Sequence, residues 1–126
     1  MNFARRVFFA AGLYGILILP PQYFLAAKVG RDFPPAITHP EFYYGFIGVA
    51  LAWQLFFFII AKDPVRYRLG MLPAIVEKVS FAAATAILYT QGRLAAQMFA
   101  AGMIDLTFAV LFLIAFGTTR RSTQVS

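Results

Sequence analysis

Two oppositely charged residues, Glu77 and Lys78, stand side by side within the apolar run from Leu72 to Tyr89. A third charged residue, Asp105, lies near the middle of a second apolar run, from Leu94 to Phe116. Charged side chains are costly inside a bilayer, and they usually face the interior of a helix bundle or a water-filled cavity. These three residues are therefore the first candidates for a functional site.

Two uncharged polar residues fall at a similar depth in the other apolar runs of the chain. At a rise of about 1.5 Å per residue, Tyr14 and Gln54 each lie about 10 Å from the helix ends on the side of the termini. Glu77 lies about 8 to 12 Å from that side. Asp105 lies roughly 16 Å from it, within reach of the long side chain of Lys78. Four helices thus supply polar groups to one buried layer.

The two charged neighbours are not expected to face the same point. Adjacent residues of an α-helix point about 100° apart. We expect Lys78 to pair with Asp105, and Glu77 to turn toward a different neighbour or toward the cytoplasmic surface. The pair between Lys78 and Asp105 then leaves the role of Glu77 unexplained.

Two interpretations of this polar layer stay open. In the first the layer is structural: Lys78 pairs with Asp105 or Glu77, while Gln54 and Tyr14 satisfy the remaining groups. Such pairs set the register of the helices and do no chemistry. In the second the layer receives the head of a lipid-like or quinone-like molecule, or forms a proton-coupled site in which Glu77 or Asp105 titrates.

Four apolar runs must position these residues, and they leave room for almost nothing else in 126 residues. We expect spans at residues 7–26, 42–61, 72–89 and 94–116, each about long enough to cross a bilayer. Hydrophobic residues make up 61% of the chain and charged residues 13%, a balance typical of integral membrane proteins. We therefore predict an all-α integral membrane four-helix bundle that forms a single domain over residues 1–126.

The basic residues are distributed unevenly between the two ends of the predicted bundle. One end holds seven of them and the other holds three: Arg5, Arg6, Lys62, Arg66, Arg68, Arg120 and Arg121 against Lys28, Arg31 and Arg93. Because cytoplasmic loops carry the excess of Lys and Arg, this places both termini in the cytoplasm, N-in and C-in. The net charge of +6 then predicts contacts with anionic membrane lipids, and not with nucleic acid.

Pro20 and Pro21 fall inside the first span, where they remove two backbone donors and should kink or break the helix. A kink tolerated by a membrane helix is the simpler interpretation. The alternative is a broken helix that lines an outer cavity, with Gln22 and Tyr23 just beyond the break as its ligand-binding residues.

Small residues on the second span, Gly45, Gly48 and Ala52, follow one helical stripe. Small residues let two backbones approach closely, and membrane helices often pack in this way. This stripe would permit the close approach of a neighbouring helix.

Cysteine is absent and His39 is the one histidine. This composition excludes disulfides, thiolate metal ligands and thiol redox chemistry, and it leaves no histidine pair for haem within one chain. We predict no metal site, no catalytic residue and no dedicated cofactor, although a quinone is compatible with the polar layer. An enzyme is therefore not the preferred class.

Three segments resemble the DoxX-like group of small four-helix bacterial inner-membrane proteins. They are HPEFYYGF before the second span, AKDPVRYR after it, and the Glu77–Lys78 pair in the third. The resemblance covers most of the chain and lies mainly in the architecture. It implies a multi-pass protein of the bacterial inner (cytoplasmic) membrane. Some members of the group are associated with quinone-linked sulfur oxidation and others with redox-related membrane assemblies.

The expected function is that of a binding or accessory component, which holds a lipid-like or quinone-like ligand or docks on a larger membrane complex. A proton-coupled small transporter or channel that uses Glu77 or Asp105 is one alternative. An isomerase-like membrane enzyme with an apolar substrate is another, and it requires a carboxylate within hydrogen-bond reach of the bound molecule. Expected partners are membrane lipids and either a larger membrane complex or further copies of the chain.

Overall fold

The chain folds entirely into helices and their connections in the computed structural model, which describes residues 2–34 and 36–119. The order is α1 (Asn2–Ile18), the 3₁₀ helix η1 (Pro20–Phe24), α2 (Ala26–Asp32), α3 (Pro40–Lys62), the 3₁₀ helix η2 (Arg68–Gly70), α4 (Met71–Thr90) and α5 (Ala96–Thr118). No strand occurs within the two described ranges. The predicted all-α class is confirmed.

Four stretches are long and apolar enough to cross a membrane: Phe3–Phe24, Pro40–Lys62, Arg68–Thr90 and Ala96–Thr118. Only 22–33% of the residues in their most apolar windows are buried inside the bundle, so most of their apolar side chains face outward. Helices that are apolar on all sides and yet exposed are typical of membrane spans. The chain is a multi-pass membrane protein with four such helices in its described part.

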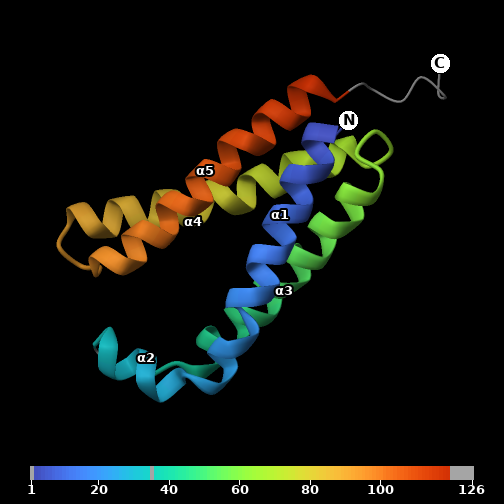
Figure 1. The fold of residues 1–126 in the computed structure, drawn as a ribbon. Coiled ribbons are helices and arrows are strands. Elements are labelled where there is room, and N and C mark those ends of the chain that lie inside the picture. The colour runs from blue at the N-terminus through green and yellow to red at the C-terminus, as the bar shows by residue number, and fades with distance from the viewer. Residues whose placement is uncertain (1, 35, 120–126) are drawn as a thin grey trace.

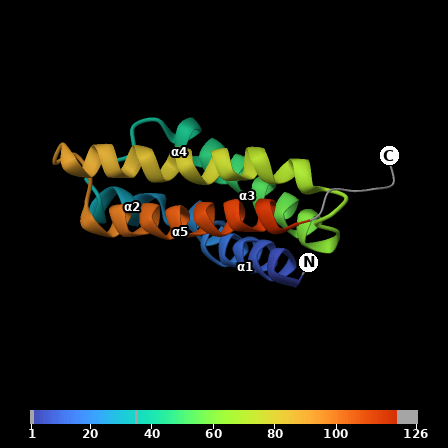
Figure 2. The same ribbon diagram turned by 90° about the horizontal axis from the view of Figure 1, so that it is seen from above.

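The four long helices form two pairs. α1 packs along α3 and α4 packs along α5, while the pairs touch each other mainly through α1 and α5. In Figure 1 the pairs meet where α1 begins and α5 ends, and they diverge toward the turn between α4 and α5. Figure 2 shows α4 and α5 side by side over their whole length. The bundle is therefore closed at one end and open at the other.

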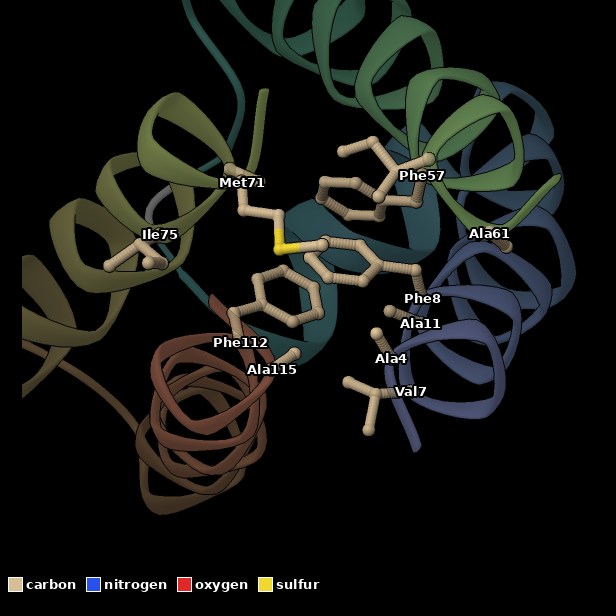
Figure 3. Packing of buried hydrophobic residues seen from close by; sticks show 12 residues of the cluster. Ala4, Val7, Phe8, Ala11, Phe57, Ala61, Met71, Ile75, Phe112 and Ala115 are labelled. Carbon is tan, nitrogen blue, oxygen red and sulfur yellow. The ribbon is translucent and has the colours of Figure 1, made fainter. Parts of the chain in front are cut away.

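An aromatic cluster joins the helices at the closed end. The rings of Phe8 and Phe112 stack with their centroids 4.1 Å apart, and Phe57 meets both rings edge-on at 6.0 and 5.2 Å. All three side chains are fully buried. Met71 points from α4 toward the Phe8 ring (Figure 3). All four long helices contribute to this cluster, which therefore sets their relative positions.

Two glycines allow close approach within the helix pairs. A Cβ at Gly15 of α1 would overlap the side-chain amide of Gln54 on α3. A Cβ at Gly102 of α5 would overlap the Thr85 hydroxyl on α4. These contacts bring α1 onto α3 and α5 onto α4.

No helix of the described chain packs against the small-residue stripe on α3. Nothing lies within 4 Å of a Cβ built at Gly45, and the Tyr23 hydroxyl lies 3.3 Å from one built at Gly48. Ala52 is exposed. The face of α3 that carries Gln54 is the one that packs, and the stripe faces outward.

The first span breaks at the two prolines, as expected. α1 ends at Ile18, and Pro20 and Pro21 begin η1, because proline lacks the backbone N–H that the preceding turn needs. Gln22 donates its side-chain amide to the Ile18 carbonyl oxygen at 3.0 Å, and the Tyr43 hydroxyl donates to the Gln22 carbonyl oxygen at 2.7 Å. The α-helix therefore stops well before residue 26, where we expected the span to end.

The segment after this break is partly helical, because α2 occupies Ala26–Asp32. α2 is supported by an ion pair one turn apart, between Lys28 and Asp32. It projects from the α1–α3 pair across the open end of the bundle (Figure 1). The helices α3, α4 and α5 begin and end within two residues of the spans expected at 42–61, 72–89 and 94–116.

Candidate functional site

A cavity of about 640 Å³ lies between the two helix pairs. The five residues assigned to the polar layer all line it: Tyr14, Gln54, Glu77, Lys78 and Asp105. Cavities of this size accommodate small organic ligands. The structure thus brings residues from α1, α3, α4 and α5 to one space.

Lys78 lies at the centre of the polar cluster. Its Nζ lies 3.2 Å from Asp105 Oδ1 and 4.0 Å from Glu77 Oε2. The same nitrogen lies 5.4 Å from the centroid of the Phe57 ring and 5.6 Å from that of Phe108. Because Phe57 belongs to the aromatic cluster, the charged residues sit at the closed end of the cavity.

Glu77 and Lys78 line the same cavity, so the expectation that they would not face one point was wrong. The angle of about 100° between adjacent residues applies to their Cα–Cβ bonds, and long side chains can bend back toward one another. The four methylenes of Lys78 bring its Nζ near both carboxylates. Ser80, almost one turn further along α4, also lines the cavity.

Gln54 is almost fully buried, with 2% of its surface exposed. Its Nε2 donates to the Ala50 carbonyl oxygen at 2.7 Å, while its Oε1 has no hydrogen-bond partner among the described residues. Glu77 Oε2 is also buried, and it too has no hydrogen-bond partner among the residues that the structure describes. Buried polar atoms are rarely left unpaired in native proteins. The cluster therefore has spare capacity to accept hydrogen bonds.

Tyr14 completes the cluster from α1. Its ring packs against Phe108 with 5.8 Å between centroids. Tyr14 and Asp105 both line the cavity. The predicted depth of Tyr14 thus agrees with its place in the cavity wall that also holds Asp105.

Gln22 and Tyr23, the residues assigned to a separate outer cavity, are placed differently from each other. Gln22 lines the same cavity as the polar cluster. Tyr23 lies outside its wall and stacks on Tyr44, with ring centroids 6.0 Å apart. The break at the prolines therefore contributes to the wall of the central cavity through Gln22.

The wall of the cavity is rich in aromatic side chains that sequence reasoning did not single out. They are Phe33, Tyr43, Phe46, Trp53 and Phe81. Phe46 and Phe81 stack across α3 and α4 at 6.1 Å. A signal was present in the sequence, because Tyr43, Phe46 and Trp53 recur at helical spacing on the side of α3 that carries Gln54.

The cavity thus combines an apolar, aromatic wall with a charged cluster at its closed end. Val29 of α2 and Phe33 reach it from the open end of the bundle. Within residues 2–34 and 36–119, no group of three side chains suited to bind a metal ion is found. The arrangement is suited to holding a molecule that has both an apolar body and a polar head.

The chain matches no protein-family model, and no curated protein or solved structure is significantly similar to it. Its function therefore has to be inferred from the cavity and the side chains that line it.

Proposed function

We propose that the protein binds an amphipathic, lipid-like or quinone-like molecule in the cavity between its two helix pairs. The main support is that one space of about 640 Å³ has an aromatic wall and a buried polar cluster at its closed end. Ligand sites typically combine a mostly apolar lining with a few polar groups that orient the ligand. The apolar body would lie against the wall, with its head at the cluster.

The hydrogen bonding of the cluster favours binding over a purely structural role. A structural layer is expected to satisfy its own polar groups, since an unpaired buried group is costly in a membrane. Lys78 and Asp105 form a hydrogen-bonded ion pair, whereas Gln54 Oε1 and Glu77 Oε2 have no hydrogen-bond partner among the described residues. A polar head in the cavity would meet the exposed parts of the Glu77 and Asp105 side chains.

We also propose that the protein resides in the bacterial inner membrane with both termini in the cytoplasm. Five of the seven basic residues behind that orientation are described, at the start of α1, the end of α3 and the connection from α3 to α4: Arg5, Arg6, Lys62, Arg66 and Arg68. Arg120 and Arg121 lie outside the described residues. The DoxX-like resemblance, docking on a larger membrane complex and quinone as the ligand stay predictions.

A proton-coupled transporter is a second candidate, because Glu77 and Asp105 both line the cavity. It requires pH-dependent flux in proteoliposomes that is lost in Asp105→Asn. Flux that survives both Glu77→Gln and Asp105→Asn would contradict it. The isomerase-like enzyme stays a prediction without a specific observation in its favour.

Native mass spectrometry of gently purified protein, combined with lipid extraction, tests the proposed binding function. We expect an amphipathic molecule to co-purify at close to one per chain and to be enriched over its share of the membrane extract. A protein that carries no such molecule, with bound lipids in the proportions of the bulk membrane, would contradict the proposal.

A further inference from the structure

The charges that line the cavity do not balance. Two carboxylates, Glu77 and Asp105, share the single ammonium group of Lys78. No other residue in the described wall of the cavity carries a formal charge. When all three groups are ionised, the cavity therefore carries one net negative charge.

The carboxylates are also the charges that a ligand would meet first. The Lys78 side chain is 4% exposed, against 19% for Glu77 and 15% for Asp105. Lys78 is held beneath them by Asp105 and by the rings of Phe57 and Phe108. An anionic head would thus meet the Glu77 and Asp105 side chains before it could reach the ammonium group.

We propose that the cavity selects a lipophilic organic cation, whose positively charged head compensates the excess carboxylate. This inference rests on the proposed binding function and adds the charge of the ligand to it. An uncompensated charge within a membrane is costly, so a cation that neutralises it there gains more than it would in water.

The aromatic wall supports the same ligand class. The faces of aromatic rings attract cations, most strongly for tryptophan, and the attraction grows when water is excluded. Tyr14 and Trp53 line the cavity from α1 and α3 and contact Phe108 and Phe57, the two rings that Lys78 also approaches. A cationic head at the polar cluster would therefore lie between carboxylates and aromatic faces.

The charge of the whole chain has the opposite sign to the charge of the cavity. With a net charge of +6, the protein as a whole attracts anions. A preference for cations would therefore have to come from a local site with the opposite sign, and the cavity is such a site.

Two ions of nearly equal size and shape but opposite charge, tetraphenylphosphonium and tetraphenylborate, provide the test. Binding is measured by equilibrium dialysis to the full chain in nanodiscs of zwitterionic lipid, with empty nanodiscs subtracted. Trp53 is the one tryptophan and lines the cavity, so its fluorescence reports occupancy. We expect saturable binding of the cation at least tenfold tighter than that of the anion.

The outcomes separate this inference from the proposed function on which it rests. The neutral alcohol farnesol is measured in the same way as a third probe. If the anion binds at least as tightly as the cation, or if only farnesol binds saturably, cation selection is overturned and the binding function stands. If none of the three binds saturably, the proposed binding function falls with it.

Glu77→Gln removes the excess charge and keeps the shape of the side chain. We expect it to weaken binding of the phosphonium at least tenfold, equivalent to about 1.4 kcal/mol. The matched control is Glu41→Gln, an exposed residue in the first turn of α3 and outside the cavity, which should leave binding unchanged. Undiminished binding by folded Glu77→Gln would overturn the inference. If that variant does not fold, the comparison of the two ions on the native chain still decides.

Discussion

Lys78 of α4 and Asp105 of α5 form an ion pair with 3.2 Å between Nζ and Oδ1. The lysine side chain is 4% exposed, and its ammonium group also lies over the Phe57 and Phe108 rings. One cation thus connects the α4–α5 pair to the aromatic cluster at the closed end. The ion pair forms part of the cavity wall at its closed end.

Lys78→Met should destabilise the bundle by about 3 kcal/mol, because it leaves a largely buried carboxylate without its counter-ion. Thermal unfolding in one detergent, followed by circular dichroism, measures the loss. Adding Asp105→Asn to Lys78→Met should recover part of it, since the uncompensated charge is removed. Strictly additive losses in this double-mutant cycle would contradict the pairing.

The exposed ion pair of α2 is a matched control for the buried one. Lys28 and Asp32 are paired one turn apart, with 59% and 47% of their side chains exposed. Lys28→Met should therefore change the stability by less than about 1 kcal/mol.

Gly15→Ala should destabilise the α1–α3 pair by about 1–3 kcal/mol, because the new methyl group would overlap the Gln54 amide. Gly45→Ala on α3 is the control, since nothing lies within 4 Å of its Cβ position. There the better helix propensity of alanine should leave the stability equal or up to about 1 kcal/mol higher. Equal effects at the two glycines would argue against the contact with Gln54.

Phe8→Ala should cost about 3–5 kcal/mol, because Phe8 is fully buried between Phe57 and Phe112. Phe9→Ala, on the same helix with 55% of its surface exposed, should cost much less. Unfolding by a graded mixture of denaturing and mild detergent compares the two variants. A larger loss for Phe9→Ala would mean that α1 is rotated about its axis relative to the structure.

Ala101→Phe should fill part of the cavity from α5 and reduce the amount of co-purified ligand severalfold. Ala100→Phe places the same ring on an exposed position outside the cavity wall, and the bound amount should not change. Native mass spectrometry of both variants measures occupancy. Unaltered occupancy in folded Ala101→Phe would place the ligand elsewhere.

Single cysteines test the orientation, because the natural chain has none. Gln91→Cys lies in the exposed turn between α4 and α5, and Arg66→Cys lies in the exposed connection between α3 and α4. With both termini in the cytoplasm, a membrane-impermeant thiol reagent added outside spheroplasts should label Gln91→Cys and spare Arg66→Cys. The reverse pattern would invert the topology.

Much of this protein follows from the sequence by itself. Apolar runs of about 20 residues must become helices, since a bilayer offers no partners for unpaired backbone groups. The regular rise of a helix places Tyr14, Gln54, Glu77 and Asp105 at similar depths, and the reach of a lysine side chain predicts the pair between Lys78 and Asp105. All five of these side chains line the same cavity.

The tertiary structure decided what depends on how each helix is rotated and tilted against its neighbours. Depth along a helix does not determine which face packs, so the small-residue stripe at Gly45 and Gly48 turned outward while Gly15 and Gly102 made the close contacts. Glu77 faces the cavity because side chains longer than one bond need not follow the direction of their Cα–Cβ bonds. The cavity itself exists because the two helix pairs are joined at the aromatic cluster and diverge beyond it, an arrangement set by packing between distant residues.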